Sequence, residues 1–253
     1  SKASDNVGAA DIHGIARRLG FASLGAMLQH LDADIICLQE VKLAALGAPE
    51  RSIALAEGYD SYFSLCRTQT PSTSFGRYAG TATFCKQHCR PHRAEEGLTG
   101  VLTRPSSSTA TAWSADAAMP SVRTGSPPGA PSDRELDGEG RCVITIHGDL
   151  AVVNVYCPAV TSDNEEKRDK RTEFKAAFLR ALERKCHSLL SEGFRVLAIG
   201  DFNVTPARID SARELEAARH EPGLPASGGS HPRPSREWLT SFLHPDPASG
   251  RTP

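Results

Sequence analysis

The amino-acid sequence predicts an α/β domain whose strands end in acidic residues. Residues 35–38 form an apolar run, which is typical of a strand buried on both faces, and Glu40 follows shortly after it. Residues 196–199 repeat this pattern and lead to Asp201. Between them, residues 165–191 carry apolar side chains at the spacing of a helix that lies on a sheet. Because open α/β sheets place their chemistry at the carboxyl ends of strands, both acids are expected at one edge.

The other elements follow from the same patterns in chain order. Strands are expected at residues 58–65, 80–85, 141–146 and 150–156, and helices at residues 22–31, 211–220 and 236–243. Residues 141–146 and 150–156 predict a hairpin, since only a short segment with Gly148 separates them. Pro158 cannot donate a ladder hydrogen bond, so the second strand is expected to end before it.

One low-complexity segment interrupts this pattern. Residues 103–138 are rich in Ser, Pro, Ala and Gly, and they are too polar and broken to pack, so they are expected to form a disordered surface loop. Strand and helix patterns continue on both sides of this loop. A chain of 253 residues fits one large domain or two small ones, and we expect a single domain over residues 11–253 with the loop inside it.

Composition sets limits on the function. The formal net charge is −1, so the strongly basic balance typical of nucleic-acid-binding proteins is absent. Metal ions can offset substrate phosphates locally, and a phosphodiester substrate therefore stays open. Seven cysteines, several of them inside apolar runs, favour a reducing intracellular compartment. No apolar run reaches the ~18 residues of a membrane span, and no signal peptide is visible, so no membrane association is expected.

Polar side chains at the strand ends are the candidate site. They are Glu40, Tyr156, Asp201 and Asn203. Each also has a purely structural explanation: the glutamate could pair with Lys42, the tyrosine could pack, and Asp and Asn favour the turn that Gly200 permits. Their shared position at the carboxyl ends of strands favours a hydrolytic metal site in which the two acids meet.

The motifs that contain these residues resemble a known superfamily. Residues 38–42 (LQEVK), 154–158 (NVYCP) and 200–203 (GDFN) are similar to the motifs of the exonuclease–endonuclease–phosphatase superfamily. Four further stretches resemble the type 2 apurinic/apyrimidinic endonucleases, which are exonuclease III-like: residues 57–64, 79–86, 94–100 and 139–145. The similarity covers residues 11–243 in order, with the insertion unaligned.

The resemblance implies a four-layer α/β sandwich, in which two mixed β-sheets pack face to face and helices flank them. It implies a monomeric nuclear enzyme, with an organellar location also open, that hydrolyses DNA in base excision repair with Mg²⁺. The reactions would be incision at abasic sites, 3′-end cleaning and 3′→5′ exonuclease action. By their match to the motifs, Glu40 is the metal ligand and Tyr156 the active-site tyrosine. Asp201 orients or deprotonates the attacking water, with Asn203 beside it, and both lie within reach of the metal.

The chain departs from the family pattern at both ends. The family's N-x-N-G-[IL]-R motif corresponds here to residues 11–16, so that Asp11 and His13 replace the asparagines and the preceding strand is missing. Both could still bind a metal, and because imidazole suits Mn²⁺ better than Mg²⁺, we expect a preference for Mn²⁺. The closing Ser-Asp-His motif and the strands before it do not follow Leu243. The fold is therefore expected to be incomplete at both ends, and activity to be weak or absent.

Contacts with DNA are predicted on a loop between two strands. Arg67, Arg77 and Tyr78 lie there, and basic or aromatic loop residues suit phosphate and sugar contacts. Solvated loop charges are the alternative. The basic residues near the start of helix 165–191, including Arg171, alternate with acids and are expected on a solvated face.

Three functions remain open. The first is the repair nuclease. The second is a non-catalytic relative that binds DNA or a repair partner. The third is a phosphoinositide or sphingolipid phosphodiesterase of the same superfamily, which the type 2 stretches around Glu95 and Gly97 disfavour.

Overall fold

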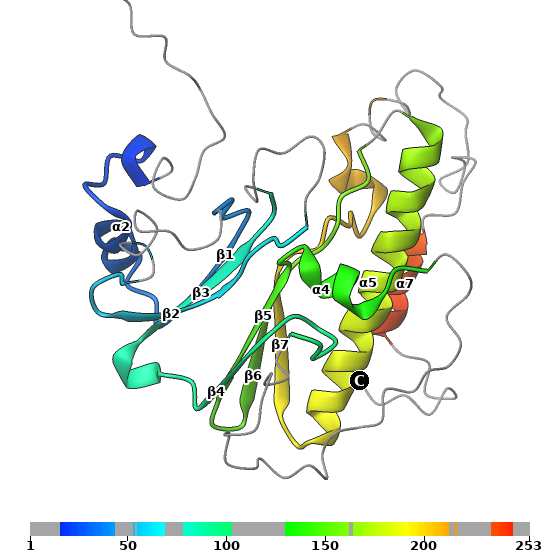
Figure 1. Cartoon of the computed structure of the whole chain (residues 1–253). Helices are drawn as coiled ribbons and strands as arrows, with labels where there is room; N and C mark the ends of the chain where they lie inside the picture. The colour runs from blue at the N-terminus through cyan, green and yellow to red at the C-terminus, as the bar shows by residue number, and fades with distance from the viewer. Residues whose placement is uncertain are drawn as a thin grey trace, which may run out of the picture.

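The computed structural model describes residues 16–43, 53, 55–68, 78–102, 130–161, 164–212, 216 and 234–244. Two sheets lie face to face in these residues, with α2 on the outer side of one and α5 and α7 on the outer side of the other (Figure 1). The strands are β1 Ile35–Gln39, β2 Tyr59–Ser64, β3 Thr81–Lys86, β4 Arg93–Glu96, β5 Cys142–His147, β6 Leu150–Tyr156 and β7 Arg195–Asp201. The α-helices are α2 Leu24–Leu31, α4 Asp133–Gly138, α5 Glu165–Ser191 and α7 Pro234–Leu243.

The two sheets differ in their strand directions. The first has the order β1-β3-β2, and both of its pairs are antiparallel. The second has the order β4-β5-β6-β7, and only β6 and β7 run parallel, so the mixed character lies in this sheet. The expected hairpin is formed by β5 and β6. Adjacent parallel strands need a crossover connection, and α5 supplies it between β6 and β7.

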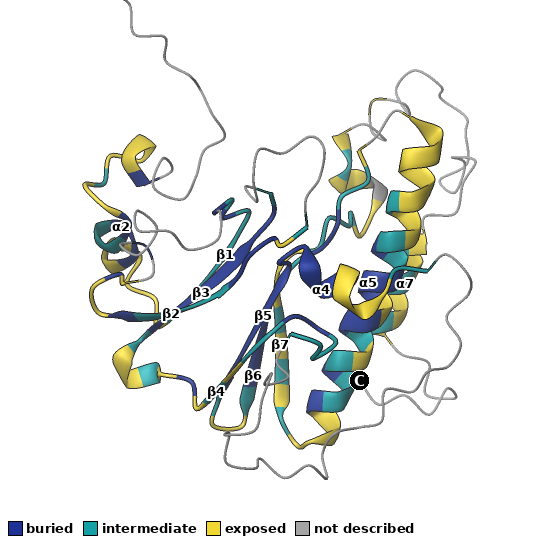
Figure 2. Cartoon of the chain, viewed as in Figure 1, coloured by how far each residue is buried: buried dark blue, intermediate teal, exposed yellow. Residues whose placement is uncertain are grey.

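Each sheet forms a core with the helix that covers it. Leu24 and Leu28 of α2 pack with Phe84 of β3, and the side chain of Ser23 caps that helix by accepting from the amide of Ala26 at 3.1 Å. The buried side of α5 packs on β5 and β6, and Figure 2 shows the buried residues gathered along this contact. The predicted bounds of α5 are confirmed, and no helix in the described residues is long and apolar enough to cross a membrane.

The two strands expected to be buried on both faces are not. In β1 only Ile36 is fully buried. In β7 the side chains of Leu197 and Ile199 are 48% and 42% exposed, while Val196 packs against the core. Their position in the sheets explains this exposure. Both β1 and β7 are edge strands in the described residues, and α5 covers only one face of β7.

Two segments differ from their expectations. Residues 133–138 of the expected loop form α4, in which the side chain of Ser132 accepts from the amide of Glu135 and the carboxylate of Glu135 accepts from the amide of Ser132. Residues 103–129 lie outside the described residues. The short strand β4 was not expected, because its sequence, Arg-Ala-Glu-Glu, is mostly charged and lacks the apolar run of the other strands. Most of the helix expected at 211–220 lies outside the described residues.

Candidate active site

Three of the predicted residues meet where β1, β6 and β7 end. Tyr156 and Asp201 are paired at the ends of the two parallel strands, so they are neighbours across the second sheet. The hydroxyl of Tyr156 donates to Oε1 of Glu40 at 2.9 Å, although Glu40 follows a strand of the other sheet. The predicted residues from the two sheets therefore lie at one edge.

Glu40 is held as an anion. Its Oε2 lies 2.7 Å from the ammonium of Lys42, and both residues have left-handed backbone angles. The hydrogen bond from Lys42 lowers the pKa of Glu40, and the bond from Tyr156 adds to this effect against the influence of burial. Burial and the bond to Glu40 raise the pKa of Tyr156 to about 12, so the phenol stays protonated and acts as a donor.

Asn203 holds the carboxylate of Asp201 in place. The amide of Asn203 donates to Oδ1 of Asp201 at 2.9 Å, and its side-chain Nδ2 donates to Oδ2 at 3.2 Å and to the carbonyl of Cys157 at 2.9 Å. The role of Gly200 differs from the expected turn, since it lies within β7 and a Cβ there would be 2.0 Å from the carbonyl oxygen of Val155. The glycine thus permits the close approach of β6.

Asn154 joins the two sheets beneath this site. It is fully buried on β6, and its Oδ1 accepts from Nε2 of Gln39 at 2.9 Å. Its Nδ2 donates to the carbonyl of Ala82 at 2.9 Å and to Oγ1 of Thr83 at 3.1 Å. In the sequence this asparagine stands out only as part of the NVYCP motif. The available signal was a polar residue inside an otherwise apolar strand.

A cluster of charged and aromatic side chains lies next to Tyr156. Arg141 is 1% exposed, and its guanidinium donates to Glu139, to the carbonyl of Tyr156 and to the hydroxyl of Tyr78. Arg171 from α5 also donates to the carboxylate of Glu139 and to the hydroxyl of Tyr78. Arg141 also lies over the ring of Tyr156, with 4.6 Å from Cζ to the ring centroid. Two guanidiniums face one carboxylate here, so the cluster carries net positive charge.

This cluster corrects one expectation. Arg171 was expected on a solvated helix face, and instead its side chain is only 20% exposed and pairs with Glu139 at 2.7 Å. Burial alone would raise the pKa of Glu139, but the bonds and charges of Arg171 and Arg141 outweigh burial and hold that pKa below its usual value. The partners lie far apart in the sequence, which is why the helical pattern alone did not indicate the pairing.

The predicted DNA-contact residues are placed differently from one another. Tyr78 belongs to the arginine cluster just described. Arg67 is half exposed, and its guanidinium already binds the carboxylate of Glu96 through two hydrogen bonds. Arg77 lies outside the described residues.

The predicted metal ligands are only partly described. Asp11 and His13 lie outside the described residues, and within those residues no group of three or more His, Cys, Asp or Glu side chains could hold an ion. Glu40 is an ionised carboxylate at the site edge, and carboxylate oxygen is the ligand that hard divalent ions prefer. Glu40 therefore fits a metal as one ligand among others.

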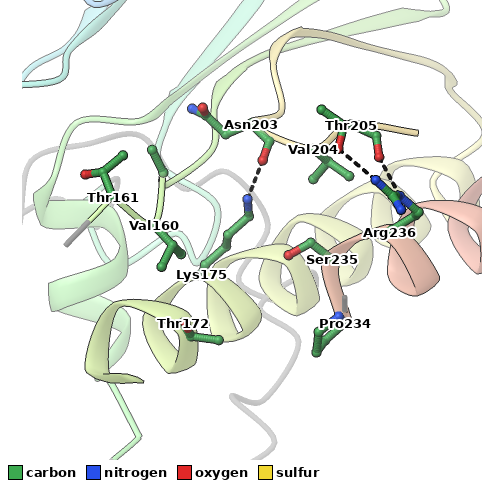
Figure 3. Close-up of a pocket in the computed structure, with 11 residues that line it drawn as sticks. Val160, Thr161, Thr172, Lys175, Asn203, Val204, Thr205, Pro234, Ser235 and Arg236 are labelled. Carbon is green, nitrogen blue, oxygen red and sulfur yellow. Dashed lines mark hydrogen bonds between the residues drawn. The ribbon is translucent and has the colours of Figure 1, made fainter. Parts of the chain in front are cut away.

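A pocket of about 390 Å³ adjoins Asn203 on the side of the helices. The loops after β6 and β7, the N-terminal half of α5 and the start of α7 line it (Figure 3). Lys175 of α5 points from this pocket toward the carbonyl oxygen of Asn203. Burial lowers the pKa of the Lys175 ammonium, and the nearby carboxylate of Asp201 opposes that shift. No pattern in the sequence indicated a role for this lysine.

Comparisons with known proteins agree with this architecture. The model of the endonuclease/exonuclease/phosphatase family matches residues 6–252. The human protein DNA-(apurinic or apyrimidinic site) endonuclease 2 is 33% identical over 234 residues, which cover 87% of this chain and 38% of that protein. Its namesake from Xenopus laevis is 34% identical over 245 residues, covering 92% and 40%. The chain thus spans about two fifths of the length of these curated relatives.

Solved structures confirm the fold. The catalytic domain of Xenopus laevis APE2 aligns with a TM-score of 0.57 at 30% identity, covering 92% of this chain and 65% of that one. An AP endonuclease from Archaeoglobus fulgidus aligns with a TM-score of 0.53 at 20% identity, covering 92% and 67%, and supports the fold alone. The predicted α/β sandwich is therefore confirmed. By its family match and its motifs, the chain belongs to the endonuclease/exonuclease/phosphatase family and within it resembles the type 2 apurinic/apyrimidinic endonucleases.

Proposed function

We propose that this chain is the nuclease region of a DNA-repair enzyme that hydrolyses phosphodiesters at abasic sites and 3′ ends. The observation that carries the proposal is the hydrogen bond between Tyr156 and Glu40, which brings the first sheet's carboxylate to the strand ends where Asp201 lies. The names of the relatives support DNA as the substrate. A nuclear location and a monomeric state belong to the same proposal.

The chain's own residues suggest how the reaction would proceed. Asn203 fixes the Asp201 carboxylate, and each oxygen keeps a lone pair that can accept a proton from a water molecule. The carboxylate can therefore orient or deprotonate that water for attack on phosphorus. The protonated hydroxyl of Tyr156 and the positive cluster of Arg141 and Arg171 suit the phosphate oxygens.

The family is divalent-metal dependent, and we propose that Glu40 is the anchoring ligand here, with Asp11, His13, Asp201 and Asn203 as further candidates. A bound cation would polarise the phosphate and stabilise the leaving oxygen. Mg²⁺ is the first candidate. The imidazole of His13 favours Mn²⁺, and a titration that finds tighter binding of Mg²⁺, or of neither ion, would count against that preference.

The test is cleavage of a labelled duplex with one abasic site, in Mg²⁺ and then in Mn²⁺. The wild-type chain is expected to cut the strand at the lesion, and Asp201→Ala is expected to lower the rate by about 10²–10⁴-fold. Asp149→Ala is the matched control, because Asp149 pairs with Arg195 at the opposite end of the same two strands and is well exposed. That control is expected to retain full activity.

Two other outcomes would replace the proposal. Salt-sensitive binding of the duplex without cleavage in either metal would indicate a non-catalytic DNA-binding relative. Turnover of a soluble phosphoinositide headgroup, with no cleavage of DNA, would place the chain among the lipid-directed phosphodiesterases of the superfamily.

A further inference from the structure

Lys175 is a buried cation directly behind the site. The residue is 6% exposed, and its ammonium donates to the carbonyl of Asn203 at 2.5 Å. Among the described residues no carboxylate lies within salt-bridge distance of this ammonium, in contrast to Lys185 on the same helix, which pairs with Glu95. A buried ammonium is costly to desolvate, and an apolar side chain of similar length would pack without that cost. The hydrogen bond to the Asn203 carbonyl is the contact of this ammonium that the described part of the chain shows.

The loop that Lys175 contacts is held by several hydrogen bonds. Asn203 has a φ of 49°, in the left-handed region that asparagine adopts more readily than most other residues. Its amide and its side chain are both used in bonds to Asp201, and the side chain also reaches Cys157. The carbonyl of Asn203 is held by Lys175 (Figure 3). Loss of that bond frees the peptide after Asn203 to rotate, which would disturb the bonds that aim the Asp201 carboxylate.

We propose that Lys175 is a positioning residue of the active site, whose ammonium holds the Asn203 backbone and thereby the Asp201 carboxylate in the reactive orientation. The proposal rests on the proposed nuclease function. Lys175 acts through Asn203 and does not touch the substrate. Misplacement of a reacting group by a small distance costs on the order of 10²-fold in rate, and supporting interactions of this kind typically contribute 10- to 100-fold.

The experiment compares three variants of the full chain. Lys175→Met removes the ammonium and keeps an unbranched apolar stem. Lys175→Arg keeps a charged donor, and the adjoining pocket of about 390 Å³ gives the larger head group room. Lys185→Met is the matched control, since it removes another partly buried lysine of α5 that lies away from Asn203. For each variant, kcat and KM on the abasic-site duplex, the urea midpoint, and hydrogen–deuterium exchange of residues 201–205 are measured.

Lys175→Met is expected to lower kcat by about 10- to 100-fold with KM nearly unchanged, and to raise exchange in residues 201–205. Lys175→Arg is expected to recover most of both losses. Lys185→Met is expected to lower the urea midpoint without changing kcat or the exchange of that loop. An unchanged kcat in Lys175→Met would overturn the proposal. So would a fall in kcat in both methionine variants that follows the fall in their urea midpoints.

The exchange measurement separates this proposal from the proposed function. If the wild-type chain cleaves no DNA, the nuclease assignment fails by itself. Raised exchange at residues 201–205 in Lys175→Met alone, reversed in Lys175→Arg, would still support the positioning role. Equal exchange in all variants would refute it whatever the wild-type activity.

Discussion

The link between the two sheets depends on Asn154, and its removal should cost both stability and site geometry. Asn154→Ala deletes four hydrogen bonds: one from Gln39, two to the carbonyls of Leu38 and Ala82, and one to the hydroxyl of Thr83. A hydrogen bond contributes about 0.5–1.5 kcal/mol net, and a buried group left without a partner costs about 1–3 kcal/mol. The carbonyl of Ala82 and the hydroxyl of Thr83 are both buried, and both lose this donor. We therefore expect the free energy of unfolding to fall by about 3 kcal/mol.

Urea denaturation followed by circular dichroism measures this loss. Asn164→Ala is the control, because Asn164 is the exposed cap of α5 and its loss should cost only about 1 kcal/mol. Asn154→Asp keeps the shape but turns a donor into an acceptor that faces the Ala82 carbonyl, so it should destabilise at least as much at neutral pH. A loss below about 1 kcal/mol in Asn154→Ala would refute the reasoning that these bonds tie the sheets together.

A double-mutant cycle extends the test to the site. Gln39→Ala and Asn154→Ala remove partners of one bond, so their effects should be non-additive by about 0.5–3 kcal/mol. Glu40 follows Gln39 directly, and Tyr156 lies two residues after Asn154. Loss of the link should therefore also separate the hydroxyl of Tyr156 from the carboxylate of Glu40, and kcat should fall in variants that remain folded.

Two further predictions concern other buried contacts. Gly97→Ala should destabilise the fold by several kcal/mol in the urea assay. Gly97 has a φ of 81°, and a Cβ there would lie 2.4 Å from the carboxyl carbon of Asp137. The control is Gly193→Ala, which should cost only about 1 kcal/mol because Gly193 has a φ of 92° but open space around it. The stability difference between wild type and Glu139→Gln should be largest at neutral pH, because the pKa of Glu139 is lowered in the fold. The carboxylate stabilises the fold above the unfolded-state pKa of about 4.3, and this contribution disappears as the pH falls through the folded-state pKa. Thermal melts of wild type and Glu139→Gln that differ equally at pH 7 and pH 3 would contradict the second prediction.

Much of the fold could be predicted because its signals are local. Helix α5 has a long amphipathic repeat and an asparagine cap, so its bounds followed from the sequence. Strands β5 and β6 are dense apolar runs around a two-residue turn, and their pairing follows from chain proximity. The burial of β7 was mispredicted because an apolar run does not say whether a second layer covers each face, and Leu197 and Ile199 are exposed.

The site was predictable only for residues that end strands. Glu40, Tyr156, Asp201 and Asn203 each follow a recognisable apolar run, so strand topology alone suggested where they would lie. The short strand β4 gave no such signal, because its side chains are mostly charged and its pairing with β5 depends on backbone groups.

The supporting residues could not be found in this way, because each acts through a contact between segments that are distant in the sequence. Arg171 belongs to a charged helical turn that looks solvated until Glu139 and Tyr78 are placed beside it. Lys175 lies one turn further along the same helix, next to Phe174 of the apolar stripe. Its role depends on a hydrogen bond to one backbone carbonyl 28 positions away. One helix thus supplies a cation to each of two neighbouring strand ends: Arg171 beside Tyr156 at the end of β6, and Lys175 beside Asp201 at the end of β7. Because both cations project from consecutive turns of α5, rotation of the N-terminal half of that helix should weaken both supports at once.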